Sequence, residues 1–144
     1  MFQRILISWD GSDAALRALD VAIDLTRRYE AELVAVSVAY SPAHAETDAD
    51  RQESATAARR YLQETFAEVK DRAERVGIDV EHHIITGDHP VPAILAYVHE
   101  HGFDLVVCGH HHGSRAGRHL LGSFAGDLVS AATTPVLVVG ESDV

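Results

Sequence analysis

The sequence has little of what secreted and membrane proteins need. It contains one cysteine, Cys108, among its 144 residues, so no disulfide can form within the chain. No apolar run approaches the roughly 18 residues that a membrane-spanning helix requires. The residues after Met1 lead into a short apolar run and lack the long hydrophobic region of a secretory signal. We therefore expect a cytoplasmic protein without a membrane partner.

Positive charge is also scarce. Twelve Lys and Arg residues stand against 22 Asp and Glu residues, which gives a formal net charge of −10 at pH 7. Duplex DNA and anionic lipid surfaces repel such a chain, so we expect neither nucleic acid nor a membrane as a partner. A small anion is still allowed, because the backbone amides of a helix N-terminus bind anions without any net positive charge.

Apolar runs and amphipathic segments alternate along the chain, whose length predicts one domain, residues 1–144. The expected strands are residues 4–9, 32–40, 79–86, 103–109 and 135–139. The polar segment 41–52 is expected to be a loop. Near-continuous apolar strands separated by amphipathic helices are typical of a parallel sheet covered on both faces. We predict an α/β fold with a single doubly wound five-stranded parallel sheet, order 3-2-1-4-5, and helices on both faces.

Helical spacing also predicts which side chains face the sheet. On the long helix after residue 52 these are Ala58, Leu62, Thr65, Phe66, Val69, Ala73 and Val76. On the last helix they are Phe124, Leu128, Val129 and Ala132. In doubly wound sheets, ligands bind at the carboxyl ends of the strands, where the strand order reverses. Two strand ends matter under that rule, at residues 9–11 and 108–109.

Three common glycine-rich motifs are missing. The turn after the first strand has only Gly11, whereas the dinucleotide fingerprint needs G-x-G-x-x-G there. Gly117 and Gly122 have the spacing of a P-loop, but Ser123 stands where the phosphate-binding lysine belongs. The hydrolase motif G-x-S-x-G is absent. These absences exclude a Rossmann dehydrogenase, a P-loop NTPase and an α/β-hydrolase.

A different glycine pattern lies between the fourth strand and the last helix. Gly109 is followed after 12 residues by Gly122-Ser123, then by a helix and the apolar strand at 135–139. In this the chain resembles the universal stress protein family, whose signature G-x-x-G-x9-G-[ST] occupies the same place. The opening strand followed by Asp10-Gly11-Ser12 is similar to the family's opening, and the resemblance covers the whole chain.

One position departs from that signature. The middle glycine is replaced by His112, and Gly113 follows one residue later. Family members with the intact signature bind ATP, and others that lack it do not. The resemblance therefore implies ATP or AMP as a ligand, with Mg²⁺ carried on the phosphates, and places His112 beside those phosphates. The residues expected around the nucleotide are Ser8, Trp9, Asp10, Val38, Cys108, Gly109, His112, Gly113, Gly122, Ser123, Phe124 and Ala125.

Elementary chemistry supports part of this site. Glycines let backbone amides approach an anion, and a helix starting at Gly122-Ser123 favours phosphate through its free amides and dipole. Asp10 can accept hydrogen bonds from ribose hydroxyls. Each residue also has a simpler interpretation: Asp10 as a cap of its turn, Ser123 as a helix N-cap, Trp9 as a core filler and Cys108 as a small buried hydrophobe.

The ten histidines raise the question of a metal. His82 and His83 are neighbours in a strand, point to opposite faces and cannot chelate together, so we expect a half-exposed sheet edge there. The run at 110–112, with His119, could bring imidazoles onto Zn²⁺ or Ni²⁺. No carboxylate lies among them, so we expect no defined metal site.

Three functions remain open. The first is a nucleotide-binding regulatory protein of the stress-response type. The second is a family member that has lost nucleotide binding through His112 and acts by protein contacts. The third is a slow ATPase, disfavoured because the loop offers no lysine or paired carboxylates. The apolar edge strand at 136–139 additionally predicts a homodimer, which the family resemblance also implies.

Overall fold

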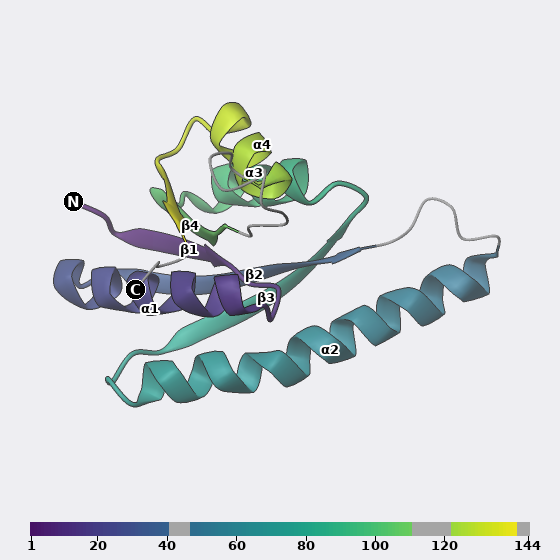
Figure 1. Ribbon diagram of the computed structural model, residues 1–144, viewed down its shortest axis with the longest axis horizontal. Coiled ribbons are helices and arrows are strands. Elements are labelled where there is room, and N and C mark those ends of the chain that lie inside the picture. Colours follow the sequence, from purple (N-terminus) through teal and green to yellow (C-terminus); the bar gives the residue numbers. More distant parts are fainter. Residues whose placement is uncertain (41–46, 111–121, 141–144) are drawn as a thin grey trace.

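The computed structural model describes residues 1–40, 47–110 and 122–140. Strands and helices alternate through these ranges (Figure 1). Their bounds are β1 (Arg4–Ser8), α1 (Asp13–Tyr29), β2 (Glu32–Tyr40), α2 (Asp48–Glu74), β3 (Val80–Gly87), α3 (Pro90–His101), β4 (Leu105–Gly109), α4 (Ser123–Ala131) and β5 (Val136–Val139). The strands form one sheet in the order β3-β2-β1-β4-β5, and every neighbouring pair is parallel. The predicted fold class and strand order are confirmed.

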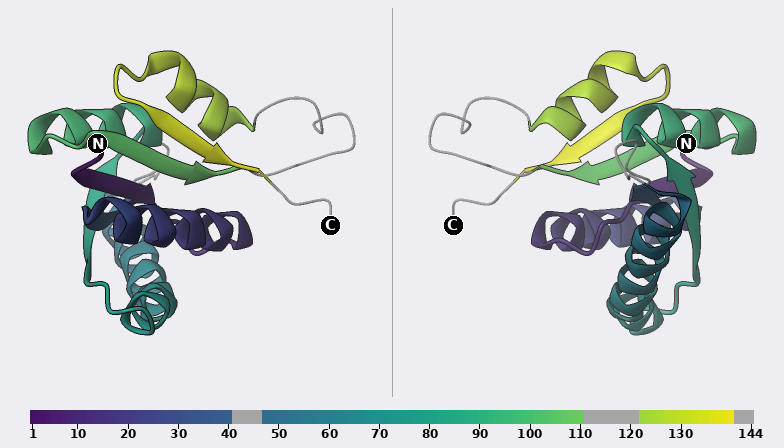
Figure 2. Two further views of the ribbon diagram at one scale, coloured as in Figure 1. Left: turned by 90° about the vertical axis from the view of Figure 1, so that its left-hand side faces the viewer. Right: turned by 90° about the vertical axis from the view of Figure 1, so that its right-hand side faces the viewer.

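The helices cover the sheet in two layers, with α1 and α2 on one face and α3 and α4 on the other (Figure 2). Side chains in a strand alternate between faces, so Ile5 and Ile7 pack in the α1/α2 layer and Leu6 packs in the α3/α4 layer. All three are fully buried. Burial on both faces explains why these strands are apolar at successive positions.

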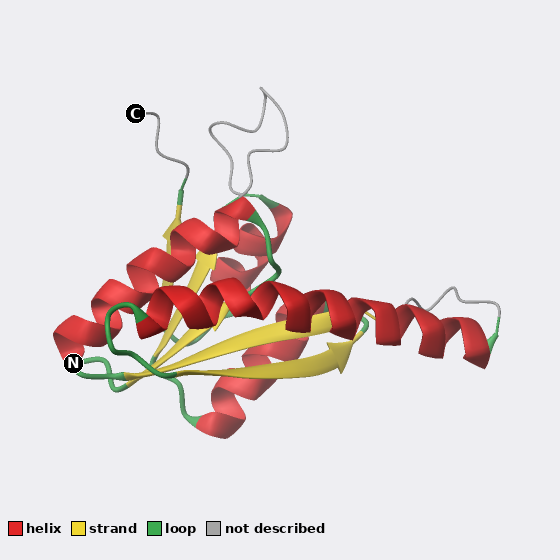
Figure 3. Cartoon of the chain, turned by 90° about the horizontal axis from the view of Figure 1, so that it is seen from below, coloured by secondary structure: helices red, strands yellow, loops and turns green. Residues whose placement is uncertain are grey.

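Helix α2 begins earlier than the sequence analysis predicts. Residues 48–52, expected in a loop, are helical, and Thr47 caps the helix by accepting a hydrogen bond from the Asp50 amide at 3.1 Å. In Figure 3 the amino-terminal part of α2 extends past the end of the sheet. This part of the sequence is mostly polar, so its composition resembles that of a loop. The capping residue Thr47 was the feature of the sequence that could have indicated the helix start.

Two residues predicted to face the sheet do not. Val76 is 39% exposed, because α2 ends at Glu74 and Val76 lies in the turn that follows. Val129 is 45% exposed, because α4 already buries Ala125 and Leu128, and the next position points about 100° further round the helix. Within the described ranges, no helix is both long and apolar enough to cross a bilayer.

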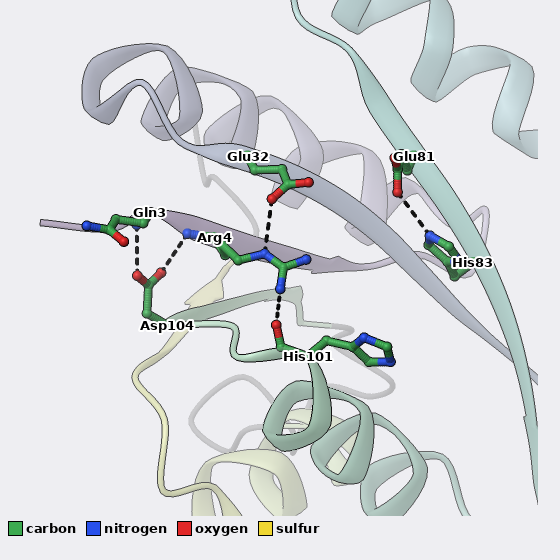
Figure 4. Close-up of polar contacts among 7 residues, drawn as sticks. All are labelled: Gln3, Arg4, Glu32, Glu81, His83, His101 and Asp104. Carbon is green, nitrogen blue, oxygen red and sulfur yellow. Dashed lines mark hydrogen bonds and ion pairs between the residues drawn. The ribbon is translucent and has the colours of Figure 1, made fainter.

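The amino ends of the central strands are held together by polar contacts (Figure 4). The Asp104 carboxylate accepts hydrogen bonds from the amides of Gln3, at 2.8 Å, and Arg4, at 3.1 Å. The Arg4 guanidinium pairs with Glu32 at 3.0 Å and also donates to the His101 carbonyl. These contacts join β1, β2 and the residue before β4 at the amino end of the sheet.

Candidate functional site

A cleft opens at the carboxyl ends of β1 and β4, where the strand order reverses. Its volume is about 130 Å³. The lining residues are Ser8, Asp10, Ser12, Ala14, Ala15, Cys108, Gly109, Gly122, Ser123, Phe124 and Ala125. The structure thus brings together most of the residues that the family resemblance places around a nucleotide.

Two helices begin at this cleft. At α1, Ser12 is the N-cap, and its hydroxyl oxygen accepts from the Ala15 amide at 3.1 Å. At α4 the N-cap is Gly122, so Ser123, predicted as a cap, is instead the first helical residue. No side chain caps α4 among the described residues. Helix geometry leaves the first amides of α4 without intrahelical acceptors, and these amides belong to cleft-lining residues.

Asp10 shapes the turn between β1 and α1. Its Oδ1 accepts a hydrogen bond from the Ser12 amide at 2.9 Å and another from the Ser12 hydroxyl. The interpretation of Asp10 as a cap of its turn is confirmed. Asp10 also lines the cleft, so one carboxylate orders the turn and faces the hollow.

Gly109 ends β4 directly beneath the first turn of α1. A Cβ atom added at Gly109 would lie 2.4 Å from the carbonyl oxygen of Ala14, which is far inside van der Waals contact. Glycine at this position therefore lets α1 approach β4, and this approach places the start of α1 over the cleft.

Cys108 precedes Gly109 and is almost fully buried in the α3/α4 layer. Burial raises the pKa of its thiol to about 11, so the thiol is protonated at neutral pH. A protonated, buried thiol is a poor nucleophile. The interpretation of Cys108 as a small buried hydrophobe is confirmed, although the residue also contributes to the floor of the cleft.

Trp9 and Val38 do not line the cleft. Trp9 is 2% exposed and packs in the α1/α2 layer, where its Nε1 donates to the Thr65 hydroxyl at 3.2 Å. This is the core-filling role considered for it. Val38 is half-buried and packs in the α3/α4 layer. His112 and Gly113 lie outside the described residues.

A serine and a histidine meet inside the sheet near Trp9. The Ser37 hydroxyl lies 2.6 Å from the Trp9 carbonyl oxygen and 2.8 Å from His82 Nε2. A carbonyl can only accept, so Ser37 donates its single hydrogen to Trp9, and His82 Nε2–H donates to Ser37. Because the imidazole is the donor, it cannot take a proton from this hydroxyl. The pair therefore ties β3, β2 and β1 together and is not a nucleophile with its base.

The two neighbouring histidines differ in environment. His82 stacks on Phe66 of α2, with ring centroids 4.4 Å apart, and burial followed by the charge of His83 lowers its pKa to about 4. His83 points to the other face and pairs with Glu81 at 3.1 Å (Figure 4). The opposite orientations are confirmed, and so is the half-exposed edge, since β3 is an edge strand on which His82 is half-buried and His83 is exposed.

Several residues of the cleft are not among those predicted from the sequence. Ser12, Ala14 and Ala15 line it because α1 starts at the same edge as α4. A helix that follows a parallel strand always starts at the carboxyl edge, so this signal was available. His110, considered only as a metal ligand, is 6% exposed, and its Nδ1 accepts from the Gly122 amide at 2.8 Å. Across the described residues, no three His, Cys, Asp or Glu side chains gather to hold a metal ion.

A second hollow continues from the cleft, between α3 and α4, with a volume of about 590 Å³. It shares Ser123 and Phe124 with the cleft and extends to His89, Pro92 and Asp127. Sites for small molecules usually enclose about 300–1,000 Å³, which is more than the cleft alone offers. A ligand that fills such a volume would therefore occupy the cleft and this groove together.

The likeness to known proteins extends over nearly the whole chain. The model of the universal stress protein family matches residues 1–140. Universal stress protein YxiE of Bacillus subtilis is 29% identical, over 96% of this chain and 99% of the relative. Universal stress protein Rv1636 of Mycobacterium tuberculosis is 31% identical, over 96% of each chain. A universal stress protein solved in complex with cAMP is 28% identical, with a TM-score of 0.75 over 98% of this chain and 99% of its own. With its sheet order, its glycine pattern and this match, the chain belongs to the universal stress protein family.

Proposed function

We propose that this protein binds an adenine nucleotide, ATP or AMP, at the carboxyl edge of its sheet and acts as a nucleotide-dependent regulatory protein. The observation that carries the proposal is the convergence of the amino ends of α1 and α4 on one cleft, with Asp10 in its lining. The relative solved with cAMP supports an adenine nucleotide as the ligand class.

The charges at the cleft give the nucleotide an orientation. The phosphates belong at α4, where the amides of Ser123, Phe124 and Ala125 and the helix dipole favour negative charge. The Ser123 hydroxyl adds one donor there. The Asp10 carboxylate repels phosphate and accepts hydrogen bonds from the ribose hydroxyls. Mg²⁺ would be held by the phosphates, since this ion keeps most of its water and needs few protein ligands.

Two substitutions test this orientation. We expect Asp10→Ala and Ser123→Ala each to weaken binding of AMP and ATP by about five- to tenfold, the scale of one lost hydrogen bond to a charged or polar ligand group. Isothermal titration calorimetry with Mg²⁺ present measures the change. Ser54→Ala, at an exposed position on α2, is the matched control and should bind as the wild type does.

Two results would contradict the proposal. One is a wild-type protein that binds neither ATP nor AMP at millimolar concentration. The other is unchanged affinity in both cleft variants, which would place the nucleotide elsewhere. Asp10→Asn distinguishes a direct effect on binding from an effect on folding. The asparagine Oδ1 can still accept from the Ser12 amide and keep the turn, while the negative charge is lost.

We also propose that two copies pair through β5. This strand is an edge of the sheet, and all four of its residues are apolar and only half-buried in the single chain. An apolar edge strand is a template for pairing with another chain. We expect wild type to have about twice the 15.6 kDa mass of one chain, and Val138→Lys to shift the protein toward monomer.

Light scattering coupled to size-exclusion chromatography measures this mass. Val129→Lys adds the same charge at an exposed position of α4, outside β5, and should leave the mass unchanged. A wild-type monomer at micromolar concentration would refute pairing, as would a dimer that both variants retain.

A further inference from the structure

We propose that His110 is a positioning residue for the phosphate end of the nucleotide site. In this proposal its imidazole holds the amino end of α4 where the first amides of the helix can reach a phosphate. The inference rests on the proposed function, because it assigns a role within the same cleft.

His110 joins three elements at the edge of the cleft. It directly follows β4 and is 6% exposed. Its backbone amide donates to the Val139 carbonyl of β5 at 3.1 Å, which fixes its main chain to the sheet. Its Nδ1 accepts from the Gly122 amide at 2.8 Å, which ties the N-cap of α4 to the end of β4 across 12 residues of sequence.

The direction of this hydrogen bond determines the tautomer of the His110 imidazole. An N–H group can only donate, so Nδ1 must carry no proton, and the neutral ring holds its proton on Nε2. His110 therefore accepts from the amide of the N-cap residue, the donor that a Glu or Gln side chain takes in a capping box, and not from the helical amides that a capping serine, threonine or aspartate takes. None of these supplies a side-chain cap to α4 within the described residues.

His110 does not use the backbone amides of α4 that are proposed to bind phosphate. His110 takes the amide of the N-cap Gly122, whereas the amides of Ser123, Phe124 and Ala125 belong to the first helical turn. The imidazole thus fixes the position of the helix start without occupying the donors that would meet a phosphate. A hydrogen bond to phosphate needs a donor–acceptor distance near 2.9 Å, so a shift of about 1 Å at the helix start removes it.

The consequence is specific to the phosphates. Asp10, the proposed ribose ligand, lies in the turn after β1 and accepts from Ser12, whereas His110 accepts from Gly122 at the start of α4. Loss of that contact should therefore weaken ligands that carry phosphate and leave the nucleoside part of binding intact. A purely structural role would instead weaken every ligand of the cleft alike.

The test compares two substitutions and two ligands. In His110→Leu, a methyl group replaces Nδ1 at similar volume and cannot accept a hydrogen bond. In His110→Asn, the Oδ1 atom stands at the same bond distance from the backbone as Nδ1 and can accept from the Gly122 amide. We expect the leucine variant to bind ATP about tenfold more weakly than wild type, and the asparagine variant within about threefold of it. Adenosine affinity should change less than about twofold in both.

Calorimetry with ATP and with adenosine separates the outcomes. Equal losses for ATP and adenosine, or unchanged ATP affinity in the leucine variant, overturn the role of His110 while leaving the nucleotide site standing. A wild-type protein that binds neither ligand overturns the proposed function and this inference together. If the leucine variant does not fold, His110→Gln replaces it, because the side-chain oxygen of glutamine lies one bond further from the backbone than Nδ1 does. The glutamine variant should then bind ATP more weakly than the asparagine variant. Equal ATP affinity of these two variants would contradict the proposal.

Discussion

Gly109→Ala is expected to lower the free energy of unfolding by about 3 kcal/mol, the upper end of what overpacking a close-packed site costs. The new methyl group would lie 2.4 Å from the Ala14 carbonyl oxygen and 2.9 Å from its side chain. Backbone atoms cannot move aside as the end of a flexible side chain can, so α1 itself must shift. Because α1 starts at the cleft, nucleotide affinity should fall together with stability.

Urea denaturation followed by circular dichroism measures this loss. Gly140→Ala is the matched control, since no atom of the described residues lies within 4 Å of a Cβ placed at Gly140. It adds the same methyl group and should change stability by less than about 0.5 kcal/mol. Equal effects of the two substitutions would show that Gly109 is not needed for the approach of α1 to β4.

Acid should destabilise the protein through His82. Its pKa is about 4 in the folded chain and 6.5 in its ordinary state, so the unfolded chain binds more protons between these values. Stability therefore falls as the pH drops from about 6.5 toward 4 and is fully present above that window. Allowing for solvent screening at a partly exposed ring, we expect about 2 kcal/mol of the acid loss to come from this residue.

Unfolding free energies measured at several pH values test the role of His82. His82→Gln keeps a side-chain donor within reach of Ser37 but does not titrate, so its stability should depend less steeply on pH between 7 and 4. His99→Gln, at an exposed position on α3, controls for the loss of a histidine and should follow the wild-type curve. If the His82→Gln curve runs parallel to that of the wild type, the half-buried His82 imidazole is not the source of the acid sensitivity.

Much of the fold could be predicted because its signals are local. Each strand is visible in the sequence as an apolar run. Apolar residues at helical spacing between these runs predict helices that connect the strands of a parallel sheet. The start of α2 was missed because residues 48–52 are polar apart from Ala49, and the amino-terminal part of the helix extends past the sheet (Figure 3). Val76 was misplaced because its spacing fits the helix, while the helix ends two residues before it.

The residues that line the cleft because they lie at the end of a strand could be predicted from the sequence. The face of the sheet toward which each of these side chains points was predicted less well. Ser8 and Asp10 line the cleft, whereas Trp9 between them points into the α1/α2 layer. The contact between His110 and Gly122 spans 12 residues, and nothing in the local sequence predicts that an imidazole meets an N-cap amide. Gly109 was predicted at the site and lines the cleft, and the structure adds a role that the sequence did not predict, which is to make room for α1.

The most direct test of the central claim is an amide chemical-shift titration of the ¹⁵N-labelled protein with AMP and Mg²⁺. If the nucleotide binds at the carboxyl edge of the sheet, the largest shifts should fall on the amides of Ser123, Phe124 and Ala125 and on Ser12 at the start of α1. The amides of Gln3 and Arg4, at the opposite end of the sheet, should not move. Saturable shifts confined to any other surface, or none at millimolar AMP, would contradict the account.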